Sequence, residues 1–511
     1  MFSRIFQNRE AVPSASENTN MVTIDALAAP EAPAHPPPVE GVPTITVSSS
    51  AEYEAVAANE EASVLAMASL RAVALANESV DEASKPPTDI VAVVDVSGSM
   101  AGSKMETMKQ ALKFVVEKGL GAQDSFSLVT FASGVDVELH FTKMDAQGKK
   151  SAVRVVEALH TKGATNLSGG LLQGLDLVCQ KARAAGALGR GTTKSVLLFT
   201  DGQANNGVTD TPGIVAAVSQ VLPQTAQEGS PASIFTFGFG ADHNETMLAA
   251  LADVSGSGQY FFVDRAEAIP VAFADALGGL VSVVAQNAEL VAEVVEGRCT
   301  IGKVLGDAYK HEVAPDGSRA ALHVGDLYAE DEKDLIVEIK LPKAAVAQDA
   351  PLPHITWSIR YFSVQKRDFE TSTALLCVSR PLAAPVSQAV NPAIVEQRER
   401  LYVAEVMKNA ADIADGGDVK GGQALLREAE ERLRSSDVKS PMVTTLVEDL
   451  ATVSAQYATR ELYESEGRKT TWMSSKVHYQ QRSAMTHGGA YEKRSKKAMK
   501  SRFVSAPPSA S

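Results

Sequence analysis

Cysteine is scarce in this sequence. Its 511 residues include only Cys179, Cys299 and Cys377, which lie far apart, and none belongs to a CxxC pair. Zinc sites and disulfide frameworks both need clustered or paired cysteines. The sequence therefore predicts neither, and a reducing compartment is the expected environment. We interpret Cys179 as a core residue, because it lies on the apolar side of a predicted helix.

Long apolar runs are also missing. The longest, such as 90–94 and 196–199, have the length of a strand, whereas a membrane-spanning helix needs roughly 20 residues. The N-terminus, MFSRIFQNRE, lacks the apolar core of a secretory signal, and Glu10 and Glu17 interrupt the basic character of a mitochondrial presequence. We therefore expect a cytoplasmic protein, with a secreted or surface adhesion protein as the disfavoured alternative.

Positive charge is sparse except near the C-terminal end. Residues 467–503 contain ten lysines and arginines and one acid, a local charge of +9, so the remainder must carry −23 to give the net −14. We expect residues 467–511 to form a flexible basic tail. Such a tail could bind an anionic surface, whereas nucleic acid is not an expected partner.

Composition changes several times along the chain. Residues 1–42 are rich in Ala, Pro, Glu and Ser and predict a disordered leader. Residues 43–85 begin with the strand-like TITVS and are expected to be the first strands of a β-domain. Residues 62–73 alternate loosely between larger and smaller side chains, and their alanines leave a helix equally open.

Residues 86–287 alternate strand and helix signals. Apolar runs at 89–94, 195–200, 233–239 and 259–263 are typical of strands buried on both faces. Segments 125–132 and 135–141 are separated by Ser133 and Gly134 alone, which predicts a hairpin. Amphipathic segments between these strands, the last at 266–286, predict covering helices. The fold class is therefore α/β, with a doubly wound, mostly parallel sheet.

The rest of the chain has a different pattern. Residues 288–382 contain short strand candidates separated by turns, which predicts a β-sandwich. Residues 392–466 are helical, with Gly416 and Gly417 breaking a hairpin and a third helix expected at 440–464. Because strand signals flank 86–287, we expect the α/β domain to be inserted in the β-domain. Its last helix would then lead directly into the strand at 289.

A group of oxygen-bearing side chains follows the predicted strands. Asp95, Ser97 and Ser99 come immediately after the first buried strand, Thr165 lies in a GATN loop, and Asp201 follows another buried strand. This pattern of DVSGSM, a loop threonine and TDG resembles the metal-ion-dependent adhesion site of von Willebrand factor A domains. The resemblance implies that these five residues bind a divalent cation, and that a partner protein supplies a carboxylate to it.

The chemistry of these residues agrees with the resemblance. Ligands of open α/β sheets bind outside the carboxyl ends of the strands, and a spacing of two puts the side chains of DxSxS on one side of an extended turn. Hard oxygen donors suit Mg²⁺, with Mn²⁺ and Ca²⁺ as alternatives. Around the metal we expect contacts to the ligand from a set of flanking residues, namely Gly98, Met100, Asn166 and Gly202.

Catalytic interpretations fit the sequence less well than a metal-dependent binding site does, and we predict that the protein is not an enzyme. No GxSxG motif surrounds Ser97 or Ser99, an aspartyl phosphatase would need an acid at position 97, and no Walker A loop occurs. Asp242, His243 and Asn244 gather near a strand end, where they are expected to cap the following helix rather than to form a second metal site.

A looser resemblance, carried by GGDVKGGQALLREAEERLRSS and WMSSKVHYQQR, links the chain to plant RING-type proteins with this domain. Those proteins carry a cysteine-rich RING, whereas no cysteine precedes Cys179 here, so ligase activity is not carried over. The predicted function is a Mg²⁺-dependent protein-binding adaptor or scaffold. A non-catalytic component of the ubiquitin pathway is the alternative.

Overall fold

The computed structural model describes the chain from residue 43 to residue 501 with several gaps. The described ranges are 43–74, 87–186, 191–201, 204–226, 231–240, 243–263, 269–280, 282–306, 309–383, 388–436, 438–483, 491–493, 497 and 501. All of them belong to one compact unit, Pro38–Ser511. The predicted leader at 1–42 and most of the chain beyond 483 lie outside the described residues.

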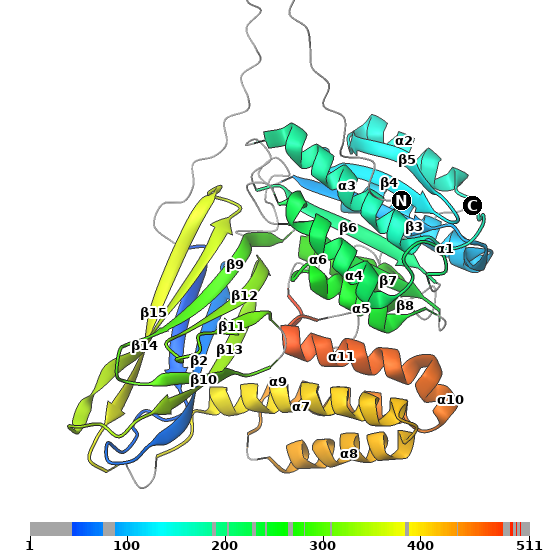
Figure 1. Ribbon diagram of the computed structural model, residues 1–511. Helices are drawn as coiled ribbons and strands as arrows, with labels where there is room; N and C mark the ends of the chain where they lie inside the picture. Colours follow the sequence, from blue (N-terminus) through cyan, green and yellow to red (C-terminus); the bar gives the residue numbers. More distant parts are fainter. Residues whose placement is uncertain are drawn as a thin grey trace, which may run out of the picture. The chain divides into compact units, whose positions relative to one another are not determined.

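A central sheet organises the α/β domain (Figure 1). Its strand order is β5-β4-β3-β6-β7-β8, and every pairing is parallel except that of β4 with β5. The strands are β3 (Thr88–Asp95), β4 (Ser125–Phe131), β5 (Val135–Lys143), β6 (Thr193–Thr200), β7 (Ser233–Phe239) and β8 (Tyr260–Val263). The doubly wound sheet and its antiparallel hairpin are therefore confirmed.

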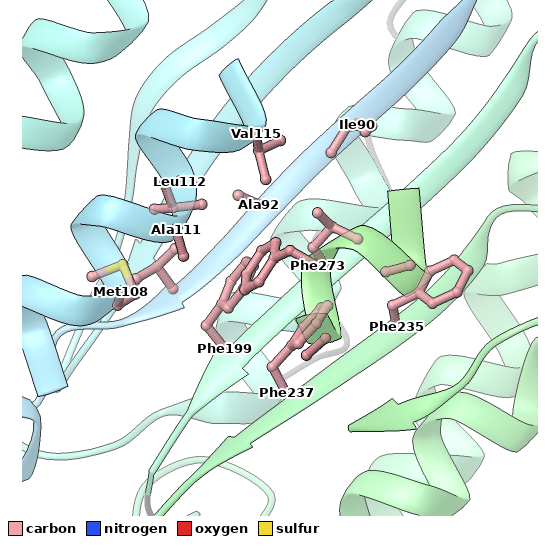
Figure 2. Close-up of a cluster of buried hydrophobic side chains, with 14 of the residues drawn as sticks. Ile90, Ala92, Met108, Ala111, Leu112, Val115, Phe199, Phe235, Phe237 and Phe273 are labelled. Carbon is pink, nitrogen blue, oxygen red and sulfur yellow. The ribbon is translucent and has the colours of Figure 1, made fainter. Parts of the chain in front are cut away.

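Helices cover both faces of this sheet. They are α1 (Ser103–Phe114), α2 (Ala146–Ala158), α3 (Leu167–Ala185), α4 (Thr211–Val221), α5 (Glu245–Val254) and α6 (Ile269–Leu280). Alternate residues of β3 point to opposite faces: Ile90 and Ala92 pack with α1 and α6, whereas Val91 and Val93 pack with α3, α4 and α5. On the first face, Phe273 of α6 stacks on Phe237 with ring centroids 4.6 Å apart (Figure 2).

The last helix of the α/β domain is shorter than predicted. We expected a helix over 266–286, but α6 ends at Leu280 and β9 (Val283–Val294) begins three residues later. Val283 and Val284 favour an extended backbone, and Val283 pairs with Tyr328 of the neighbouring strand. The expected direct passage from helix to strand is present, and the strand begins earlier than residue 289.

The β-domain consists of two antiparallel sheets, ordered β1-β2-β13-β10 and β11-β12-β9-β14-β15. Besides β9, the strands are β1 (Ile45–Ala51), β2 (Ala62–Ala72), β10 (Thr300–Val304), β11 (His311–Val313), β12 (Arg319–Tyr328), β13 (Glu332–Leu341), β14 (Gln348–Ser363) and β15 (Asp368–Arg380). Residues 62–72 are thus a strand, not a helix. Because β2 pairs with β13 across the intervening α/β domain, with Ala66 opposite Val337, that domain is inserted in the β-domain.

A helical region follows the β-domain. It contains α7 (Pro392–Asp415), α8 (Val419–Ser435), α9 (Pro441–Ala455), α10 (Arg460–Leu462) and α11 (Arg468–Gln480). The break between α7 and α8 falls at Gly416 and Gly417, and the positive φ of Gly417, 103°, suits glycine. The expected third helix over 440–464 ends earlier, at Ala455. Among the described residues, no helix combines the length and apolar character required to cross a membrane.

The prediction of a flexible tail from residue 467 onward is wrong for its first part. Residues 468–480 form α11, in which Thr471, Ser474 and His478 are buried. Lys476 of this helix pairs with Asp253 of α5 at 2.5 Å. Small and polar side chains let α11 pack closely against its neighbours, so the basic composition of this segment does not leave it in solvent.

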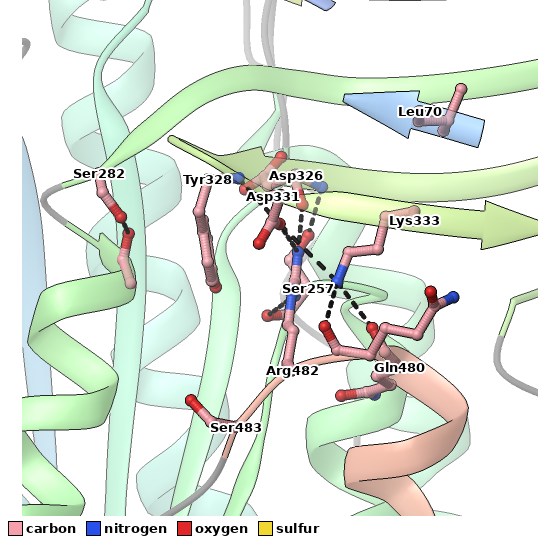
Figure 3. A network of polar contacts seen from close by, with 12 residues as sticks. Leu70, Ser257, Ser282, Asp326, Tyr328, Asp331, Lys333, Gln480, Arg482 and Ser483 are labelled. Atoms are coloured by element: carbon pink, nitrogen blue, oxygen red, sulfur yellow. Dashed lines mark hydrogen bonds and ion pairs between the residues drawn. The ribbon is translucent and has the colours of Figure 1, made fainter. Parts of the chain in front are cut away.

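Residues just after α11 join three parts of the fold (Figure 3). The guanidinium of Arg482, which is buried, donates to the backbone oxygens of Asp326 and Ser257 and lies 3.6 Å from the Asp331 carboxylate. Lys333 of β13 donates to the Gln480 carbonyl at 2.7 Å. The short segment around Arg482 thus holds the α5–β8 connection, the β-domain and the helical region together.

Candidate metal centre

Two aspartates stand at the carboxyl ends of adjacent central strands. Asp95 is the last residue of β3, and Asp201 follows Thr200, the last residue of β6. These strands pair in parallel, and the order of connection reverses between them, since β4 lies on one side and β7 on the other. Ligand sites of doubly wound sheets lie at such a reversal. Both carboxyl groups are fully buried there.

The DxSxS loop connects the two aspartates by a chain of hydrogen bonds. The Oδ1 atom of Asp95 accepts the backbone N–H of Ser97 at 2.8 Å. The hydroxyl oxygens of Ser97 and Ser99 lie 3.0 Å apart, and Ser99 donates to Oδ1 of Asp201 at 2.8 Å. Ser97 is buried, whereas Ser99 is exposed. The loop therefore presents its hydroxyls between the two carboxylates, with Ser99 on the solvent side.

Thr165 is positioned by hydrogen bonds between its own backbone and the segment after β6. Its N–H donates to Oδ1 of Asn205 at 2.8 Å, and its carbonyl accepts the N–H groups of Asn205 at 3.1 Å and Asn206 at 3.2 Å. On the other side, the N–H of Gly98 donates to the Gly163 carbonyl at 3.2 Å. The Thr165 loop is thus hydrogen-bonded both to the DxSxS loop and to the segment after β6, and Thr165 is buried.

The electrostatics of Asp95 suit a cation. Burial raises the pKa of this carboxyl above its ordinary value, and hydrogen bonds from Ser97 and Thr200 oppose the rise. The Thr200 hydroxyl donates to Oδ2 at 2.7 Å. Ser97 and Thr200, which donate these hydrogen bonds to Asp95, are both uncharged, so neither balances the charge of an ionised Asp95. A buried carboxylate normally has a cationic partner or binds a metal.

The donor set fits a hard divalent ion. The described residues contain no group of three or more His, Cys, Asp or Glu side chains that could enclose a metal. A metal bound between Asp95 and Asp201 would therefore need hydroxyl oxygens as further ligands. Two carboxylates and three hydroxyls match the oxygen preference of Mg²⁺. Because the Ser99 hydroxyl donates a hydrogen bond to Asp201, its oxygen keeps a lone pair that a cation can use.

Other residues expected around the metal have different positions. Gly98 is exposed at the loop. Asn166 is the N-cap of α3, where its Oδ1 accepts the Gly169 N–H at 3.0 Å. Met100 is fully buried in the core beneath α1, so its side chain does not reach the surface where a ligand would bind. Gly202 lies outside the described residues.

The polar group after β7 serves the fold. Asn244 caps α5 by accepting the Met247 N–H at 3.0 Å, as predicted. His243 is buried between the Gly240 carbonyl and the Tyr260 hydroxyl, at 2.8 and 2.6 Å, and burial lowers its pKa to about 4. Asp242 lies outside the described residues. Cys179 is buried on α3, as expected.

Sequence analysis missed Lys104, Thr200 and Asn205. Lys104, in the first turn of α1, places its Nζ 2.5 Å from Oδ2 of Asp201. Thr200 precedes Asp201 directly, and Asn205 follows it within the same connection. The sequence signal for Lys104 was a lysine at the start of a helix, where a cation is electrostatically unfavourable and calls for a partner.

The fold and the arrangement of these loops define residues 89–275 as a von Willebrand factor type A domain, and the family model of that name matches this range. Over 396 residues the chain is 26% identical to the E3 ubiquitin-protein ligase WAV3 of Arabidopsis thaliana. This match covers 76% of this chain and 48% of the ligase. Over 167 residues it is 29% identical to human inter-alpha-trypsin inhibitor heavy chain H3, covering 32% and 18%. The chain therefore spans half or less of the length of these relatives.

A solved structure extends the similarity of fold beyond this domain. The structure of von Willebrand factor type A from Catenulispora acidiphila covers 86% of this chain and 98% of its own, with a TM-score of 0.62 and 16% identity. The β-domain and helices that accompany the inserted domain thus occur together in another protein. At this identity the likeness concerns the fold alone.

Proposed function

We propose that this protein is an adaptor or scaffold whose von Willebrand factor type A domain binds a partner protein through a divalent cation. The observation that carries the proposal is the hydrogen-bonded chain from Asp95 through Ser97 and Ser99 to Asp201. It puts two buried carboxylates and two hydroxyls at the switch point of the sheet, beside an exposed loop. Mg²⁺ is the proposed physiological ion.

Each residue of the site has a distinct proposed role. Asp95 supplies a buried negative charge, Ser97 and Ser99 supply neutral hydroxyl oxygens, and Thr165 adds a hydroxyl from the third loop. Asp201 accepts a hydrogen bond from the Ser99 hydroxyl and so orients that hydroxyl. A bound divalent cation supplies a hard Lewis acid for a carboxylate of the partner. The exposed Ser99 marks the side from which that carboxylate approaches.

Partner capture in the presence and absence of metal tests this function. The full-length protein is immobilised, and bound proteins are identified by mass spectrometry in Mg²⁺, in EDTA and with an Asp95→Ala variant. We expect specific partners in Mg²⁺ alone, while the thermal unfolding of the variant stays close to that of the wild type. Capture that persists undiminished in EDTA would exclude the metal from binding.

A second candidate function rests on the extent of one similarity. The match to the plant ubiquitin ligase covers 76% of this chain, more than the von Willebrand factor type A domain alone. We propose as an alternative that the protein is a non-catalytic component of a ubiquitin pathway. An assay with ubiquitin, activating enzyme and conjugating enzymes should show no ligase activity, and ubiquitin chains formed by the isolated protein would contradict this view.

The cytoplasmic location stays a prediction in both cases. Cell fractionation distinguishes it from the secreted or surface adhesion protein that we consider disfavoured. Recovery of the protein in the medium or on the cell surface would favour adhesion instead.

A further inference from the structure

A lysine stands beside the candidate metal centre in a place that the helix itself does not favour. Lys104 belongs to the first turn of α1, and positive side chains are disfavoured at a helix N-terminus because the helix dipole is positive there. Its side chain reaches Asp201, with Nζ 2.5 Å from Oδ2. One third of the Lys104 side chain is exposed, whereas that of Asp201 is fully buried. The contact with Asp201, and not the helix dipole, therefore accounts for a lysine at this position.

The two oxygens of Asp201 are thereby engaged by different partners. Oδ1 accepts the Ser99 hydroxyl at 2.8 Å, and Oδ2 accepts Lys104. We propose that Lys104 is a built-in counter-ion of the metal centre, which holds part of the Asp201 charge away from a bound cation. The inference rests on the proposed metal-dependent function and identifies the residue that keeps the bound cation attractive to a partner's carboxylate.

The charges of the three side chains give this role a direction. Asp95, Asp201 and Lys104 together carry −1, so a divalent cation leaves the group at +1. With a neutral residue at position 104, the two aspartates neutralise the cation completely. Charges interact strongly in such a partly buried setting, where water and salt screen them less. Lys104 should therefore weaken metal binding and strengthen carboxylate binding at the same time.

These opposite effects distinguish a counter-ion from a residue that only supports the fold. If Lys104 served to orient the site, its removal would weaken both metal and carboxylate binding. If it were a surface lysine without a role, its removal would change neither. A lysine on the same helix offers a matched control: Lys113 has 35% of its side chain exposed, against 33% for Lys104, and pairs with Glu157 at 2.6 Å.

The experiment compares full-length wild type, Lys104→Met, Lys104→Arg and Lys113→Met. Calorimetry gives the affinity for Mn²⁺, and water proton relaxation of the Mn²⁺ complex gives the affinity for acetate as a simple carboxylate. For Lys104→Met we expect Mn²⁺ binding to tighten by roughly three- to tenfold and acetate binding to weaken by a similar factor, the scale of one partly exposed charge. Lys104→Arg and Lys113→Met should match the wild type.

Each outcome bears on one claim. A folded Lys104→Met variant with unchanged or weaker Mn²⁺ affinity, or with undiminished acetate affinity, would overturn the role of Lys104 while leaving the metal centre standing. A wild-type protein that binds no Mn²⁺ would overturn the proposed function itself, and the role of Lys104 with it. Equal behaviour of Lys104→Met and Lys113→Met would show that position 104 is not special.

Discussion

Replacing Arg482 by methionine should strongly destabilise the protein. The Arg482 guanidinium is buried at the junction between the α5–β8 connection and the β-domain, where it donates to the carbonyls of Asp326 and Ser257. It also lies 3.6 Å from the Asp331 carboxylate and 4.2 Å from the ring centre of Tyr328. Methionine fills part of the same space but supplies neither charge nor donors.

The magnitude follows from what the variant leaves behind. Breaking a buried ion pair by removing one partner costs about 3 to 5 kcal/mol, because the other charge stays buried. Here Lys333 remains 3.8 Å from Asp331 and compensates part of that charge. Two backbone carbonyls lose a charged donor as well. We therefore expect the free energy of unfolding to fall by about 3 kcal/mol, the lower end of that range.

Urea unfolding followed by circular dichroism measures this loss. Arg460→Met is the matched control, because Arg460 forms an ion pair with Glu464 at 2.7 Å with both side chains more than half exposed; its loss should cost less than about 0.5 kcal/mol. Hydrogen exchange should also rise around Ser257, the contact of Arg482 in the α/β domain. If Arg482→Met lowers stability by no more than the control does, the junction does not hold these parts together as argued.

Two further predictions concern the core of the α/β domain. Because burial lowers the pKa of His243 to about 4, against about 6.5 for an unfolded histidine, the unfolded state binds more protons between these values. The stability that this residue contributes is complete above pH 6.5 and is lost as the pH falls toward 4, by roughly 3 kcal/mol. In urea unfolding, the free energy of unfolding of a His243→Gln variant should therefore depend less on pH than that of the wild type. Identical pH dependences of the two proteins would contradict the burial of His243. A Cβ on Gly174 of α3 would meet Val93 Cγ2 at 2.5 Å, so Gly174→Val should lower the free energy of unfolding by about 2 to 3 kcal/mol through overpacking. The control Gln180→Val, on the exposed side of α3, should lower it far less. Equal shifts of the thermal unfolding midpoint in the two variants would refute this packing.

Much of the candidate site could be predicted from local pattern. Asp95 and Asp201 each follow an apolar run that is buried on both faces, so the sequence places them at the ends of central strands. The chemistry of DxSxS then indicates oxygen ligation. Lys104 could not be placed in this way, because its contact depends on how far a flexible side chain reaches from α1 toward the end of β6. Sequence periodicity carries no information on such a reach.

Prediction of the fold was weakest where burial does not follow hydrophobicity. The segment around Thr471 and His478 is polar and basic and looked like a tail, but its small side chains allow close packing and its polar groups find partners. The end of α6 was misplaced because Val283 and Val284 fit a helical period as well as a strand. Pairing with β12 and β14 decides the matter, and those partners are remote in sequence.

Calorimetric titration of the full-length protein with Mg²⁺ tests the central claim most directly. Asp95→Asn removes the buried charge at one end of β3, whereas Asp89→Asn, at the other end of the same strand, removes a buried carboxylate that pairs with Lys181 at 2.6 Å. We predict saturable binding of Mg²⁺ by the wild type and by Asp89→Asn, and its loss in Asp95→Asn. Binding that survives unchanged in Asp95→Asn, or that the wild type itself lacks, would contradict a metal centre at this edge of the sheet.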